Sequence, residues 1–187
     1  MENFIIIAVI LLLGFGGTFY LIPSRNQRRL ARFRIDARSS GLVVTAVSLP
    51  KYDSLPEERV SAGGKKRDPR VLCCSYSLPL RAKNPITPTW QIRRSKQSSV
   101  PLIGWEFADG LPLYVQISDH EYWRELDDVL ENLPDSCLAV TSDHSGVGWI
   151  GQEKLMGDSQ QFLIQLKEQL QAILDLNERA IAEEDAI

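Results

Sequence analysis

The chain contains two histidines, and each ends a copy of the same tripeptide: Ser118-Asp119-His120 and Ser142-Asp143-His144. An aspartate that hydrogen-bonds an imidazole can orient it as a general base. Adjacent residues rarely point at each other, however, and catalytic triads assemble from distant positions. The first copy stands at an expected helix start and the second in an expected hairpin turn, where Asp and Ser are favoured for local reasons. We interpret both tripeptides as local structure.

The three cysteines, Cys73, Cys74 and Cys137, are the other side chains with reactive chemistry. Vicinal cysteines seldom pair with each other, and a structural zinc site needs four ligands at spacings such as C-x₂₋₄-C. We interpret these cysteines as small apolar residues buried in strands. The glycine-rich phosphate loops, the H-E-x-x-H motif and the G-x-S-x-G motif are also missing from the sequence. The sequence therefore predicts a protein that is not an enzyme and needs no metal or cofactor.

The N-terminus is dominated by nineteen mostly apolar residues from Phe4 to Ile22, and residues 3–24 contain no Asp, Glu, Lys or Arg. As a helix this segment spans roughly 28 Å, close to the ~30 Å thickness of a bilayer's hydrocarbon core. A cleaved signal peptide would have a basic start and an A-x-A-like cleavage site, and neither is present. We predict a single transmembrane anchor over residues 1–23. Gly14 and Gly17 lie within it and could form a helix-packing face for another membrane protein, although the G-x-x-x-G spacing is absent.

Basic residues follow the apolar segment at once: Arg25, Arg28, Arg29, Arg32, Arg34 and Arg38. Basic residues beside a span remain on the cytoplasmic side. We therefore predict a single-pass protein of the cell inner membrane, with its N-terminus outside and its C-terminal domain in the cytoplasm.

Residues 24–41 are predicted to form a basic juxtamembrane helix that ends at Gly41. One face would carry Arg25, Arg28, Arg29 and Arg32, and another face would carry Phe33. We predict that these five residues lie at the membrane interface, where Phe33 embeds and the arginines meet lipid phosphates. In the alternative interpretation the helix simply continues the membrane span and its arginines only fix the topology.

Charge is divided unevenly along the chain. Residues 1–100 hold 17 Lys+Arg against 6 Asp+Glu, a balance of +11, and residues 101–187 hold 4 against 18, a balance of −14, which together give the net charge of −3. Either the basic half faces anionic headgroups, or the two halves neutralise each other within one fold. Four tryptophans could stack on nucleic-acid bases, but the acidic half would repel a polyanion and tryptophans in strands usually fill a core. No nucleic-acid binding is expected.

Residues 42–187 are predicted to form one α+β domain, an antiparallel sheet with two helices. A polar segment from Lys51 to Arg70 is expected to be a mobile loop, and an apolar stripe on the last helix is expected to pack on the sheet rather than in a coiled coil. The expected strands cover residues 42–47, 71–80, 89–93, 100–107, 111–117, 137–141 and 147–151, and the expected helices begin near Ser118 and Asp158.

An anchor joined to a domain without a visible catalytic motif suggests a membrane-anchored, non-catalytic interaction module. Its expected partners are the lipid bilayer and another membrane protein, as for an accessory or assembly subunit of a membrane complex. The alternative is a membrane-tethered enzyme or ligand sensor, with a pocket near His120 and His144.

Overall fold

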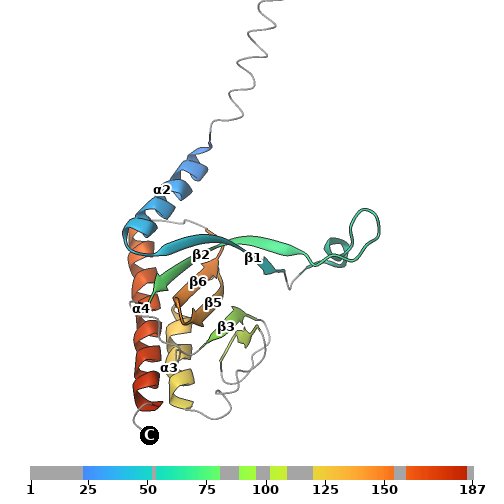
Figure 1. Cartoon of the computed structure of the whole chain (residues 1–187). Helices are drawn as coiled ribbons and strands as arrows, with labels where there is room; N and C mark the ends of the chain where they lie inside the picture. The colour runs from blue at the N-terminus through green and yellow to red at the C-terminus, as the bar shows by residue number, and fades with distance from the viewer. Residues whose placement is uncertain are drawn as a thin grey trace, which may run out of the picture.

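The computed structural model describes residues 23–51, 54–80, 89–95, 102–108, 120–153 and 159–184 (Figure 1). They form an α+β fold in which an antiparallel sheet packs against α-helices, as the sequence predicts. The predicted anchor, with Gly14 and Gly17, lies outside these ranges except for Pro23. Among the helices that are described, none combines the length and the apolar character needed to span a bilayer.

The sheet has six strands in the order β1-β2-β6-β5-β3-β4, and every neighbouring pair is antiparallel. Hairpins join β1 to β2 and β5 to β6, whereas β1 and β4 are the edge strands. The predicted strand over residues 111–117 lies outside the described residues. The strands are β1 (Val43–Pro50), β2 (Arg70–Pro79), β3 (Trp90–Arg94), β4 (Trp105–Phe107), β5 (Cys137–Asp143) and β6 (Gly146–Gly151).

Three α-helices accompany the sheet: α2 (Arg25–Ser39), α3 (His120–Glu131) and α4 (Ser159–Glu184). Helices α3 and α4 lie side by side, and α4 contacts β2 and β6 (Figure 1). The predicted apolar stripe of α4 is buried there, which confirms packing on the sheet; it consists of Leu163, Leu166, Leu170 and Ile173. The four tryptophans are buried as well, and so are Cys73 and Cys137.

A largely buried chain of neutral hydrogen bonds ties these helices to the sheet. The indole N–H of Trp90 donates to the hydroxyl of Tyr122 at 2.9 Å, and that hydroxyl donates to Asn177 Oδ1 at 2.7 Å. The amide of Asn177 in turn donates to Ser142 Oγ at 2.9 Å, and Asn177 is 0% exposed. The four residues come from β3, α3, α4 and β5, so the chain of bonds fixes both helices against the sheet.

Helix α2 belongs to the same core. Phe33 is only 2% exposed, and its ring centroid lies 5.4 Å from that of Tyr76 and 5.7 Å from that of Phe162. Ala37 is fully buried, and the left-handed Gly41 (φ 93°) then turns the chain into β1. The prediction that Phe33 embeds in the membrane interface is therefore corrected, because this ring already has apolar neighbours inside the protein. A fragment that begins at residue 42 would lose part of the core.

The segment between β1 and β2 is more ordered than the predicted mobile loop. It contains a short 3₁₀ helix, η1 (Pro56–Arg59), and an isolated bridge between Val60 and Lys66. Lys51 Nζ also lies 2.5 Å from Glu58 Oε1, so an ion pair ties the end of β1 to η1.

Candidate functional site

The four arginines predicted for the membrane interface all lie exposed on α2: Arg25, Arg28, Arg29 and Arg32. Their spacing of i, i+3, i+4 and i+7 places them on one helical face. The helix starts in a capping box, in which Ser24 Oγ accepts from the Gln27 N–H at 3.2 Å and Gln27 Oε1 accepts from the Ser24 N–H at 2.8 Å. Four guanidinium groups are thus held on a regular helix that is anchored in the core. We call these four residues the basic face.

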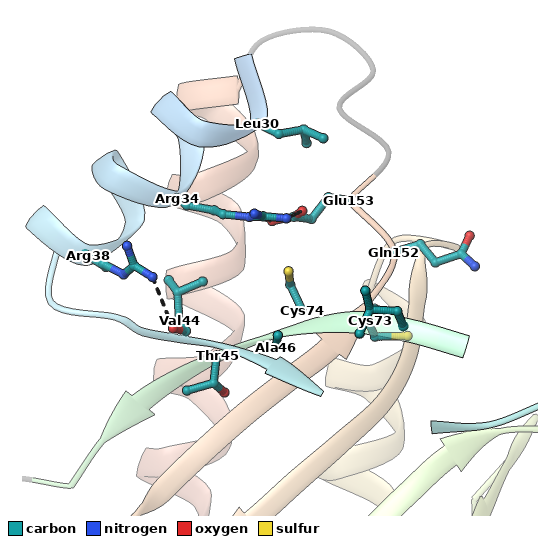
Figure 2. Close-up of a pocket in the computed structure, with 12 residues that line it drawn as sticks. Leu30, Arg34, Arg38, Val44, Thr45, Ala46, Cys73, Cys74, Gln152 and Glu153 are labelled. Carbon is teal, nitrogen blue, oxygen red and sulfur yellow. Dashed lines mark hydrogen bonds and ion pairs between the residues drawn. The ribbon is translucent and has the colours of Figure 1, made fainter. Parts of the chain in front are cut away.

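A groove of about 390 Å³ opens beside α2, between this helix, the β1–β2 hairpin and the residues that follow β6 (Figure 2). Its walls come from Leu30, Arg34 and Arg38 on one side and from Gly151–Glu153 on the other. Its floor consists of Val44, Thr45, Ala46, Leu72, Cys73 and Cys74. No histidine is among these lining residues, so the groove is not the pocket expected near His120 and His144.

Arg34 and Glu153 face each other across the groove (Figure 2). Arg34 Nε donates to Glu153 Oε1 at 2.8 Å, and Arg34 Nη2 donates to Oε2, which makes a two-point contact. The hydroxyl of the fully buried Tyr76 donates to the same carboxylate. The Glu153 side chain is 7% exposed and the Arg34 side chain 41%. This polar cluster fastens α2 to the sheet.

The protonation states of the cluster follow from these contacts. Burial pushes the pKa of Glu153 upward, but the hydrogen bonds from Arg34 and Tyr76 outweigh burial and leave the pKa below its usual value. The hydrogen bond to Glu153 raises the pKa of Arg34. Burial, reinforced by Glu153, raises the pKa of the Tyr76 hydroxyl. At neutral pH the cluster is therefore an ion pair with a neutral phenol, and Glu153 is poorly suited to act as a proton acceptor.

The sulfur of Cys74 points toward this ion pair, whereas Cys73 points away from it (Figure 2). Burial and the nearby Glu153 carboxylate raise the pKa of the Cys74 thiol. Burial also raises the pKa of Cys137, to about 12. Because the thiolate is the nucleophilic form, these side chains are inert thiols, and all three cysteines are unpaired.

The described copy of the Ser-Asp-His tripeptide leads from the end of β5 into the hairpin turn that the sequence predicts. Ser142 is buried and bonded to Asn177, whereas Asp143 Oδ1 accepts from the Ser145 N–H at 2.6 Å and His144 is exposed. The three side chains thus serve different contacts. In the other copy, Ser118 and Asp119 lie outside the described residues, and for His120 only its backbone place at the start of α3 is described.

Ion pairs join the basic and acidic halves of the sequence. Besides Arg34 and Glu153, Arg93 Nε lies 3.6 Å from Glu106 Oε1 and Arg94 Nη1 lies 3.7 Å from Asp135 Oδ1. These contacts favour mutual neutralisation of the two halves at Arg34, Arg93 and Arg94. None of the three belongs to the basic face, whose arginines lie exposed on α2.

Comparisons with protein-family models, with curated proteins and with solved structures gave no match. The function is therefore inferred from the basic face and the groove alone.

Sequence reasoning identified the basic face but not the groove. Arg34 and Glu153 are 119 positions apart, and no motif connects them. Arg34 is distinguishable only because it falls outside the i, i+3, i+4, i+7 series that starts at Arg25. Nothing local to Glu153 marks it as a buried carboxylate.

Proposed function

We propose that this chain is a membrane-anchored, non-catalytic interaction module, an accessory or assembly subunit of a membrane protein complex. The observation that carries the proposal is the construction of α2. This helix directly follows the apolar residues 4–22, presents the basic face to solvent, and is locked into the domain by Phe33 and Ala37. One helix therefore joins the basic face to the folded domain immediately after the apolar residues.

The basic face fits the anionic headgroups of a cytoplasmic leaflet, because each Lys or Arg near such a surface contributes about 1 kcal/mol. We propose the single-pass inner-membrane topology with a cytoplasmic domain on the same grounds. Gly14 and Gly17 are the proposed contacts with a second membrane helix.

Topology is tested by fusing a reporter after Ile187 in the full chain and treating intact cells with external protease. A protected reporter that is degraded only after the inner membrane is opened agrees with the proposal. Degradation in sealed cells excludes a cytoplasmic domain.

The basic face is tested on a fragment that begins at Pro23 and so retains every described residue. Its binding to vesicles with 30% anionic phospholipid is compared between Arg25→Gln/Arg32→Gln and a matched control, Lys65→Gln/Lys66→Gln, which removes the same charge from the exposed loop. The arginine pair is expected to reduce the vesicle partition coefficient about 10- to 30-fold, and added salt is expected to reduce the difference. Equal losses in the two variants would argue against a specific basic face.

The interaction role is tested by gentle-detergent purification of the tagged full chain and mass spectrometry of the proteins that co-purify. A reproducible stoichiometric partner supports a subunit, and it should be lost when Gly14 and Gly17 are replaced by Leu if the span forms the contact. A clean monomer or homodimer would contradict the subunit proposal.

A further inference from the structure

The groove lies beside the open edge of β1, and the strand register shows which backbone groups face outward there. The N–H of Lys51 donates to the C=O of Pro69 at 2.8 Å, one step beyond the pair formed by Pro50 and Arg70. In an antiparallel pair, hydrogen-bonded and non-bonded positions alternate. The odd-numbered residues of β1 therefore bond to β2, and the N–H and C=O groups of Val44, Ala46 and Ser48 point away from it.

Two arginines already hydrogen-bond to some of these outward-pointing backbone groups. Arg38 Nη2 donates to the C=O of Val44 at 3.5 Å (Figure 2), and Arg70 Nη2 donates to the C=O of Ser48 at 3.0 Å. Both arginines are exposed, and within the described residues the outward groups of Ala46 between them have no partner. An open edge of this kind is a template for another strand, and charged side chains are a common protection.

The chemistry along this edge is basic at both ends and apolar between them. The two capped carbonyls are four residues apart, which is roughly 13 Å along a strand. Ala46 lies between them, and the adjoining groove exposes Leu72, which is 77% exposed and pairs with Ser48 in the strand register, and the half-buried Leu30. Glu153 is the carboxylate among the lining residues, and it is already paired with Arg34.

We propose that the outer edge of β1 binds an extended segment of a partner protein, which joins the sheet beside β1 and carries two acidic residues four positions apart around an apolar residue. The inference rests on the proposed interaction function and names the surface and the partner chemistry. The acidic side chains draw Arg38 and Arg70 into charge-assisted hydrogen bonds. The carbonyls of Val44 and Ser48 then become free to pair with the backbone of the segment, and its apolar side chain lies over the groove near Leu72.

The probe is a capped seven-residue peptide, threonine-glutamate-threonine-valine-threonine-glutamate-threonine, added to the detergent-solubilised full chain. One control replaces both glutamates with lysine. A second control exchanges the last two residues, so that the acidic side chains are five positions apart and project from opposite faces of the strand. Affinity is measured by fluorescence anisotropy, and hydrogen–deuterium exchange is followed by mass spectrometry over Val43–Pro50.

The expected result is binding of the first peptide at least about 10-fold tighter than either control, with slowed exchange at the outward amides of Val44, Ala46 and Ser48. Ala46→Pro removes the central outward N–H, which is tolerated on an edge strand because it leaves the ladder to β2 intact. It should reduce the affinity about 10-fold or more, whereas Ala46→Ser, which keeps the N–H, should change the affinity less than about 3-fold. Arg38→Glu should also weaken binding of the acidic peptide.

Binding without protection of the outward amides, equal binding of the lysine peptide, or no binding of any peptide would each overturn the inference. Failure of the inference remains distinguishable from failure of the proposed function. If a stoichiometric partner co-purifies equally with Ala46→Pro and wild type, the subunit proposal is supported and binding at the edge of β1 is contradicted. If the peptide binds as expected but no partner co-purifies, binding at the edge of β1 is supported and the subunit proposal is contradicted.

Discussion

Two polar clusters fasten helices to this sheet, and they use different chemistry. The network around Asn177 is neutral and largely buried, and it is shared by α3, α4, β3 and β5. The cluster around Glu153 is charged, opens on the groove and joins α2 to β2 and to the end of β6. Neutral hydrogen bonds do not titrate near physiological pH, whereas an ion pair depends on both protonation and solvent screening. The comparison suggests a permanently fixed core and an attachment of α2 that responds to conditions.

The largest effect is expected for Asn177→Leu. The substitution removes two hydrogen bonds of the buried Asn177, the one that its Oδ1 accepts from Tyr122 and the one that its amide donates to Ser142, at a cost of about 1–1.5 kcal/mol each. We expect the free energy of unfolding of the fragment from Pro23 to fall by about 3 kcal/mol in urea denaturation. The control, Asn132→Ala, removes an exposed amide and should change it by less than about 0.5 kcal/mol. A loss below about 1 kcal/mol for Asn177→Leu would show that the network contributes little.

A smaller effect is expected for Glu153→Gln. The change keeps the shape of the side chain but removes the charge that faces Arg34, and Arg34 is exposed enough for water to replace part of the interaction. We expect a loss of about 1.5 kcal/mol. A double-mutant cycle with Arg34→Gln isolates the pair, because the second substitution should cost much less once the carboxylate is gone. Additive losses would contradict the coupling.

The same carboxylate should give the cluster a pH dependence that the neutral network lacks. The folded pKa of Glu153 is lowered, so its stabilisation is complete above the unfolded value of about 4.3 and disappears as the pH falls through the folded value. The facing groups do not titrate in this window, because Arg34 stays protonated while Tyr76 and Cys74 stay neutral. The stability difference between wild type and Glu153→Gln should therefore shrink below about pH 4.3.

The stability difference between wild type and Asn177→Leu serves as the control, because it should stay constant over the same pH range. Measuring differences between variants also cancels the contribution of Asp143, whose pKa is likewise lowered, because the hydrogen bonds from Ser145 outweigh its burial. If the difference in the free energy of unfolding between wild type and Glu153→Gln does not change with pH, the carboxylate contributes no net charge interaction.

The two clusters also show what could be read from the sequence. Periodicity sufficed for α2 and α4, because their apolar residues recur at helical spacing, and turn chemistry sufficed for the β5–β6 hairpin. The role of Phe33 was misassigned because an apolar side chain on a basic helix fits a membrane interface as well as a protein core. Glu153 and Asn177 were missed because their partners lie 119 and 35 positions away, and no local pattern encodes a contact of that range.

The smallest effect is expected at the exposed end of the same α3–α4 pair that Asn177 joins. Arg179 Nη2 lies 2.6 Å from Glu125 Oε2, a shorter distance than any bond of the neutral network. The Arg179 side chain is nevertheless 63% exposed, so water solvates it in both the folded and the unfolded chain. Arg179→Gln should therefore change the free energy of unfolding by less than about 0.5 kcal/mol, and 0.5 M salt should remove most of that. A loss as large as that of Asn177→Leu would mean that distance rather than burial determines how these helices are held.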